Sequence, residues 1–149
     1  MELHPDFREL LASFNSHHVE YLVVGGYAVA FHGAPRFTGD IDLFVRATPD
    51  NAQRVVSALT AFGFGSLGLS AADFSVEHRV VQLGYEPWRV DLLTSLEGVS
   101  WAEAERGSVA ADFGVPVRVI GRAELLRNKR ALARPQDLAD ADRLANGDE

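Results

Sequence analysis

The segment that most constrains the fold runs from residue 21 to residue 45 and combines two short strand patterns with a glycine pair. It begins with Tyr-Leu-Val-Val at positions 21–24, an apolar, β-branched run that predicts a short buried strand. Gly25 and Gly26 end this run, and the apolar residues 27–32 fit a short helix packed under a sheet. A loop punctuated by glycine and proline follows. The segment therefore predicts a strand, a helix and a loop that lead into a second strand.

The second strand, residues 40–45, begins with two carboxylates. Because side chains two residues apart share one face of a strand, Asp40 and Asp42 point to one side, while Ile41 and Leu43 point into the core. Two adjacent carboxylates both stay ionised only with a cation between them or with good solvation. Hard cations such as Mg2+ take oxygen ligands of this kind, so the pair indicates a divalent-metal platform. The alternative is an exposed Asp-x-Asp that caps a turn.

The glycine pair favours the metal interpretation. Between a strand and a helix, Gly25 and Gly26 let backbone N–H groups approach an anion closely, with the positive end of the helix behind them. A phosphate-binding turn beside metal-binding carboxylates indicates a nucleotide-binding site.

A third acidic residue lies inside a later strand pattern. Residues 78–85 and 88–94 predict two strands joined by a turn at residues 86–87. Asp91 is unusual in the second strand, because aspartate is depleted in strands and seldom buried without a partner. The alternatives are an edge-strand aspartate and a salt bridge to Arg89.

The C-terminal third predicts a helix over residues 122–134 and another that starts at Pro135. Lys129 is the one lysine among 14 basic residues. Helical spacing places it within an apolar arc and places three arginines on the opposite face. The arc contains Leu125, Leu126, Leu132 and Ala133, and the arginines are Arg127, Arg130 and Arg134. An inward lysine needs a partner, and a nucleotide phosphate would serve. The alternatives are a lysine that extends to solvent or pairs with a structural acid. The arginines form a solvated face or contact an RNA or an acidic partner.

The remaining patterns are ordinary. An amphipathic helix is expected over residues 4–18, a helix from Thr48 as N-cap to about Phe62, and an irregular connection over residues 63–76. A helix over residues 100–107 has a capping box, and residues 109–113 and 115–120 predict a hairpin around Gly114. His17 and His18 are interpreted as solvated, and His32 as a structural histidine, although it lies near the proposed phosphate site.

Composition excludes several classes of protein. At 149 residues, with 47% hydrophobic and 23% charged residues, the chain predicts one globular domain over residues 1–149. The net charge of −7 argues against broad nucleic-acid binding, although a local basic patch could bind RNA. The absence of cysteine excludes disulfides and thiolate metal sites. Without a signal-peptide pattern or an apolar run of about 20 residues, we expect no membrane contact and a cytoplasmic location.

Three separated motifs resemble one superfamily. The glycine pair, thirteen residues and then Asp40-Ile41-Asp42 resemble the signature of nucleotidyltransferases with the DNA polymerase beta-like fold. The spacing is closer to small bacterial nucleotidyltransferases of the abortive-infection toxin type than to aminoglycoside nucleotidyltransferases. Residues 36–40 resemble the R-x-T-x-D lead-in of that branch. The stretch from Lys129 to residue 140 resembles its K…K-D-x-x-D motif, with Gln136 where a basic residue is common.

The resemblance implies an α/β (α+β) fold, a mixed sheet flanked by helices, with the catalytic sheet over residues 21–120 and helices over residues 122–146. It implies transfer of a nucleoside monophosphate from an NTP to an acceptor, with two Mg2+ ions, or Mn2+, held by three carboxylates. Those are Asp40, Asp42 and Asp91, with Asp91 also as general base. The expected nucleotide-binding residues are Gly25, Gly26, Arg36, Thr38, Lys129 and Asp137. Asp137 either orients Lys129 or, as an acidic residue in the first turn of its helix, interacts favourably with the helix dipole.

The acceptor stays open among an RNA, a protein and a small-molecule hydroxyl. The toxin-type resemblance adds a role in a toxin–antitoxin pair, with a protein partner or a second copy of the chain completing recognition. Two alternatives use the same fold with weak or no catalysis: a binding partner or antitoxin, and a nucleotide sensor.

Overall fold

The computed structural model describes residues 3–33, 39–85 and 88–146. Across these residues the chain forms a six-stranded sheet in the order β3-β4-β2-β1-β6-β5. The strands are β1 (Tyr21–Val24), β2 (Asp40–Val45), β3 (Val80–Tyr85), β4 (Trp88–Leu93), β5 (Val109–Asp112) and β6 (Pro116–Val119). The expected turn at residues 86–87 lies outside the described residues.

The sheet mixes parallel and antiparallel pairs. β2 runs antiparallel to β1 and parallel to β4, and β1 runs parallel to β6. Each outer pair, β3–β4 and β5–β6, is an antiparallel hairpin. Gly114 has φ +93° between β5 and β6, a conformation that glycine adopts without strain, as the predicted hairpin requires. The α/β class and the mixed sheet are therefore confirmed.

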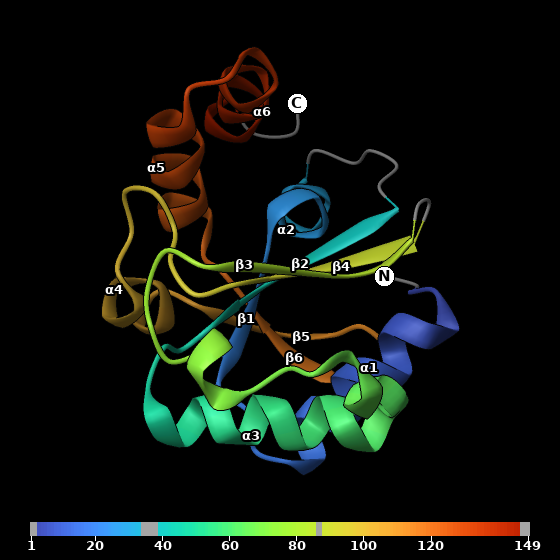
Figure 1. Cartoon of the computed structure of the whole chain (residues 1–149). Helices are drawn as coiled ribbons and strands as arrows, with labels where there is room; N and C mark the ends of the chain where they lie inside the picture. The colour runs from blue at the N-terminus through green and yellow to red at the C-terminus, as the bar shows by residue number, and fades with distance from the viewer. Residues whose placement is uncertain (1–2, 34–38, 86–87, 147–149) are drawn as a thin grey trace.

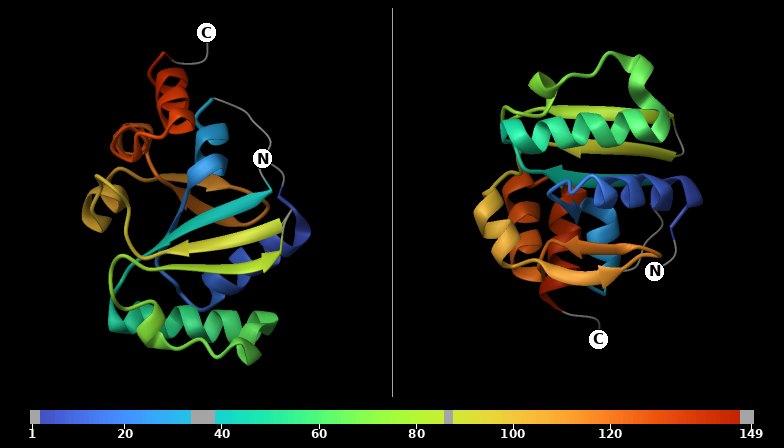
Figure 2. Two further views of the ribbon diagram at one scale, coloured as in Figure 1. Left: turned by 45° about the horizontal axis from the view of Figure 1, so that its top comes forward. Right: turned by 90° about the horizontal axis from the view of Figure 1, so that it is seen from below.

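Helices cover both faces of the sheet (Figure 1). They are α1 (Pro5–Ser16), α2 (Gly25–Phe31), α3 (Pro49–Leu59), α4 (Trp101–Arg106), α5 (Arg122–Leu132) and α6 (Pro135–Ala145). α1 and α3 lie on one face, and α2, α5 and α6 lie on the other (Figure 2). Ile41 and Leu43 of β2 are fully buried, while Asp40 and Asp42, on the opposite face, are half-buried. The alternation predicted for this strand is confirmed.

Helix starts follow the expected caps. The Thr48 side chain accepts a hydrogen bond from the Asn51 N–H at the start of α3. Ser100 and Glu103 form the predicted capping box at α4. Asn51, itself fully buried, bonds the backbone at Glu20 and Arg46, and so ties the start of β1 to the end of β2.

Several predicted boundaries were wrong. α1 ends at Ser16 and β3 begins at Val80, each two residues inside the predicted range. α2 begins at Gly25, so the glycine pair forms the first turn of the helix and does not precede it. α3 ends at Leu59 and passes into a π-helical turn, residues 60–64, because Gly63 leaves helical geometry at φ +123°. α5 ends at Leu132, since Ala133 adopts a left-handed φ of +59°. Ala133 is consequently exposed and does not extend the apolar arc.

Within the described residues, no helix combines the length and the apolar character that crossing a bilayer demands.

Candidate active site

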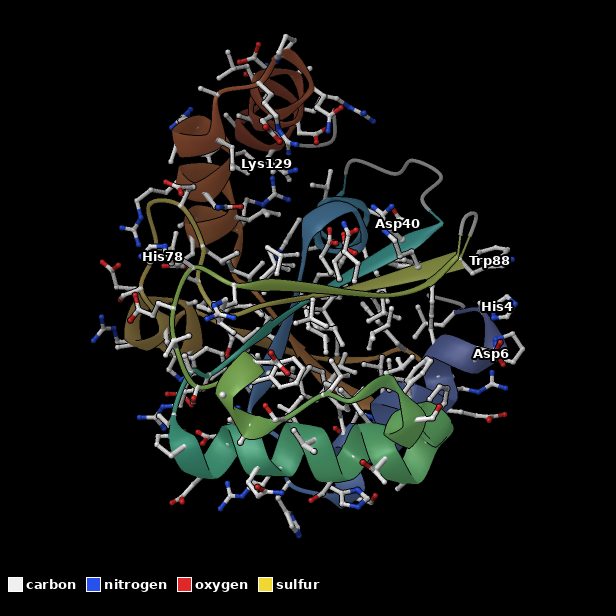
Figure 3. All side chains as sticks on the ribbon, in the orientation of Figure 1. His4, Asp6, Asp40, His78, Trp88 and Lys129 are labelled. Carbon is white, nitrogen blue, oxygen red and sulfur yellow. The ribbon has the colours of Figure 1, made fainter. Side chains whose placement is uncertain are left out.

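The register between β2 and β4 brings the three predicted carboxylates together. Asp42 pairs with Asp91, and Asp40 pairs with Arg89. Because the two strands are parallel and in register, these four side chains emerge on the same face. Figure 3 shows Asp40 on this face, beside α2 and on the same side of the sheet as Lys129.

Asp42 packs directly against the first residue of α2. A Cβ atom placed on Gly25 would lie 2.0 Å from Oδ2 of Asp42, closer than any van der Waals contact allows. Gly25 also has φ +66°, where a side chain costs about 1–2 kcal/mol. Glycine is therefore required here twice, once by the backbone and once by the neighbouring carboxylate.

Burial and neighbouring acids change the acidity of Asp42. Desolvation, the charge of Asp91, a hydrogen bond to the Asp91 side chain and the charge of Asp40 together raise the pKa of Asp42 to about 7. The charge of Lys129 acts in the opposite direction. Near neutral pH, Asp42 is therefore partly protonated, as expected of a carboxyl group that is buried beside other acids. A cation bound between Asp42 and Asp91 would displace that proton.

Arg89 bridges the other two carboxylates. Its Nη2 lies 3.0 Å from Oδ2 of Asp40, and its Nε lies 3.1 Å from Oδ1 of Asp91. Nη2 also lies 3.5 Å from Oδ2 of Asp91, so the guanidinium reaches both oxygens of that carboxylate. The salt bridge to Arg89 considered for Asp91 is present, and it coexists with the placement of Asp91 among the other acids.

Lys129 is buried and held by acids of α6. Its Nζ lies 3.3 Å from Oδ1 of Asp137 and 3.4 Å from Oδ2 of Asp140. Asp137 is fully buried and also accepts a hydrogen bond from Nη2 of Arg134 at 3.1 Å. Burial alone would raise the pKa of Asp137, but the bonds from Arg134 and Lys129 outweigh it and hold that pKa below its usual range. The pairing of Lys129 with structural acids is therefore observed, and Asp137 does orient Lys129.

These groups line one open cleft of about 580 Å³ over the carboxylate face of the sheet. The lining includes Gly25, Gly26, Asp40, Asp42, Arg89, Asp91, Asn128, Lys129 and Arg134. One wall is fixed by Asn128, whose Nδ2 donates to the Glu97 carbonyl at 2.9 Å and so ties α5 to the segment after β4. His78 and Arg79 line the cleft near the start of β3.

Six of the predicted site residues therefore share this cleft, and Asp137 lies behind Lys129 as its partner. Arg36 and Thr38 lie outside the described residues. Arg89 and Arg134 also line the cleft, although neither was predicted as a site residue. For Arg89 a signal existed, because residues 89 and 91 share a face of the strand. Arg134 was predicted on the face opposite Lys129, and this was wrong. Because α5 ends at Leu132, Arg134 instead bonds Asp137, three residues later, and lines the same cleft as Lys129.

Other polar groups have structural partners. His32 contacts the Ile120 carbonyl through Nε2 at 2.7 Å, as its structural interpretation requires. His17 is half-buried, with its Nδ1 2.9 Å from the Ser13 carbonyl, so only His18 is exposed as expected. Among the arginines on the exposed face of α5, Arg127 pairs with Glu103 at 3.4 Å.

The donor set suits a hard divalent cation, because three carboxylates lie together on β2 and β4 and a bound cation would offset their mutual repulsion. The geometry is not that of a ready cage. In the part of the chain that the structure describes, no three acidic or histidine side chains are already arranged around an ion position. The guanidinium of Arg89 stands among these carboxylates instead.

No family model and no curated protein matches the chain. Solved structures do match. The solution structure of the antibiotic-resistance factor ANT(2'')-Ia has a TM-score of 0.57 and 16% identity, covering 94% of this chain and 80% of that chain. Its crystal structure in complex with adenylyl-2''-tobramycin has a TM-score of 0.55 and 17% identity, covering 93% and 84%. An antigenic nucleotidyltransferase-like protein from Paracoccidioides brasiliensis has a TM-score of 0.53 and 18% identity, covering 97% and 78%.

At these identities the likeness concerns the fold. The chain has the nucleotidyltransferase fold, as the glycine pair and the Asp-x-Asp motif predicted. The finer resemblance to the toxin-type branch stays a prediction.

Proposed function

We propose that this chain is a metal-dependent nucleotidyltransferase that moves a nucleoside monophosphate from an NTP to an acceptor hydroxyl. The observation that carries the proposal is the pairing of Asp42 with Asp91 directly against Gly25, in a cleft that Lys129 also lines. Carboxylates for a cation, a glycine turn for phosphate and a basic group on one face are the parts that phosphoryl transfer needs.

Each residue has a role in this proposal. Asp40, Asp42 and Asp91 would hold divalent cations, Mg2+ with Mn2+ as the alternative, which would neutralise the triphosphate and stabilise the leaving oxygen. Gly25 and Gly26 would bind the phosphates through backbone N–H groups. Lys129 would supply positive charge, with Asp137 holding it in place. Arg36 and Thr38 belong to the same proposed nucleotide site by their motif.

The chemical step is a substitution at the α-phosphorus. The acceptor oxygen forms a bond to that phosphorus, the bond from the α-phosphorus to the bridging oxygen breaks, and pyrophosphate leaves with its electron pair. Asp91 takes the proton of the acceptor hydroxyl at a carboxylate oxygen. This role requires a free lone pair on that oxygen when the acceptor binds.

The proposal specifies the acceptor only by its chemical class, a hydroxyl on an RNA, a protein or a small molecule. The ANT(2'')-Ia crystal structure was determined in complex with adenylyl-2''-tobramycin, so the fold accommodates an adenylylated small molecule. The motif resemblance adds a role in a toxin–antitoxin pair, in which a partner protein or a second copy of this chain would help to recognise the acceptor.

Isothermal titration with each NTP, with and without Mg2+, tests the nucleotide site. Wild type should bind with Mg2+, and Asp42→Ala should weaken that binding by at least about tenfold. Asp50→Ala is the matched control, because it removes the same charge from α3, on the opposite face of the sheet. Metal-dependent transfer of labelled NMP to RNA, protein or small-molecule fractions would then identify the acceptor. Binding without transfer would favour a nucleotide sensor, and no binding would favour a partner-binding role.

A further inference from the structure

Among the described residues, Arg89 is a cation that contacts two members of the carboxylate cluster. Its guanidinium contacts both oxygens of Asp91 and one oxygen of Asp40, at 3.0–3.5 Å. The three side chains are partly buried, with 28% of Arg89, 30% of Asp40 and 15% of Asp91 exposed. Ion pairs with limited solvent access are less screened than surface pairs, so the positive charge of Arg89 offsets much of the negative charge of the cluster.

A divalent ion would need the same oxygens. Both oxygens of Asp91 already lie near the guanidinium, so an ion that bridges Asp91 and Asp42 must compete with Arg89 for Asp91. An ion on Asp40 meets the same guanidinium from the other side. Arg89 also repels an incoming ion directly, because like charges a few ångströms apart in a partly buried site interact strongly.

Among the described residues, the neighbour of Arg89 across the β3–β4 pair has no side chain. This register partner is Gly84. Gly84 must remain glycine, since it has φ +86° and an added Cβ would lie 2.9 Å from the Trp88 carbonyl oxygen. The partial exposure of Arg89 into the cleft gives the side chain a path away from the carboxylates.

We propose that Arg89 is the resident counter-ion of this cluster, competing with divalent metal for Asp40 and Asp91 and so limiting metal affinity in the free protein. This inference rests on the proposed metal-dependent function. It assigns Arg89 as a positioning residue: in the absence of metal it keeps the carboxylates together, and it leaves them when metal and nucleotide arrive. The negative nucleotide offers the displaced guanidinium a new partner in the same cleft.

Titration with Mn2+, followed by the electron paramagnetic resonance of the free ion, tests the inference without an activity assay. Arg89→Met should bind Mn2+ at least about tenfold more tightly than wild type, because it removes both the competition and the repulsion. Arg89→Lys should bind with intermediate affinity, since its ammonium retains the charge without the fork that spans two carboxylates. Arg79→Met is the matched control. Arg79 is exposed and lines the same cleft, so this change alters the charge equally and should change affinity by less than about twofold.

The outcomes separate this inference from the proposed function. Equal or weaker Mn2+ binding by Arg89→Met, with wild type still binding, would overturn the inference and leave the metal site in place. Equal tightening by Arg79→Met would also overturn it, since net charge alone would then explain the effect. Mn2+ binding that Asp42→Asn leaves unchanged would refute the metal site, and with it both proposals. Thermal melting of each variant in chelator confirms that the compared proteins are folded.

Discussion

Replacing Asp42 with asparagine should stabilise the metal-free protein, and the gain should grow as pH rises. In the folded state the pKa of Asp42 is raised from 3.8 to about 7 by burial and by its acidic neighbours. Between about pH 4 and pH 7, the folded chain therefore still holds a proton on Asp42 that the unfolded chain has already released. A folded state that binds more protons loses stability as pH rises through that range. Asparagine does not ionise, so the variant avoids this loss.

The magnitude follows from the size of the shift. A rise of about 3 pKa units corresponds to about 4 kcal/mol at 1.36 kcal/mol per unit, which is an upper bound. The cleft is open and the two carboxyl groups can move apart when both ionise, so we expect about half of that value, about 2 kcal/mol at pH 8. For a chain of this length the melting temperature in chelator should increase by about 4–8 °C. Below about pH 4 the difference should disappear.

Urea unfolding of wild type and Asp42→Asn in chelator, at intervals from pH 4 to pH 8, measures this difference directly. Asp50→Asn supplies the control, because its side chain is exposed at the start of α3 and its difference from wild type should be small across the upper part of that range. A stability difference that is constant with pH, or a destabilised Asp42→Asn protein at pH 8, would refute the argument that Asp42 holds a proton near neutrality.

Two further substitutions test packing around the cleft. Gly25→Ala should lower the free energy of unfolding by about 2–4 kcal/mol and abolish nucleotide binding. The control is Gly68→Ala, at a similar φ of +73° but with nothing within 4 Å of an added Cβ, which should show only the backbone strain of about 1–2 kcal/mol. Equal losses of stability in urea unfolding would show that contact with the carboxylate is unimportant. Lys129→Met should destabilise the chain by about 3 kcal/mol, because two buried carboxylates of α6 lose a partner. Arg130 is exposed, so Arg130→Met should change stability by less than about 0.5 kcal/mol. Similar melting temperatures for these two variants would contradict the stabilising role of Lys129.

Much of the site follows from local rules. Side chains two residues apart in a strand always lie on the same face. The shared face of Asp40 and Asp42 could therefore be predicted from the sequence. The placement of Lys129 inside the arc of α5 followed from helical spacing in the same way. Both depend on contacts within one element, and both are confirmed by burial in the folded chain.

The partners of these groups were not readable, because they belong to other elements. The bridge from Arg89 to Asp40 depends on the register between β2 and β4, which no local pattern specifies. The acids that hold Lys129 were visible as a motif, but their burial depends on the packing of α6 against α5. The early end of α5 depends on the left-handed conformation of Ala133, which is uncommon for alanine. Pro135 disfavours helical geometry only at Arg134, so the sequence did not place the end at Leu132.

The parallel pairing of β2 with β4 also links chemistry to the order of folding. Gly25 meets Asp42 through β1, α2 and β2, which are consecutive in the chain, whereas Asp91 reaches them only after α3 and β3 have been traversed. Long-range strand pairing must overcome the entropy of closing a large loop, so it forms late. A chain in which β4 has not yet paired with β2 therefore holds two of the three carboxylates together and lacks Asp91, the proposed proton acceptor. In the proposed reaction, catalytic competence would therefore require the pairing of β4 with β2.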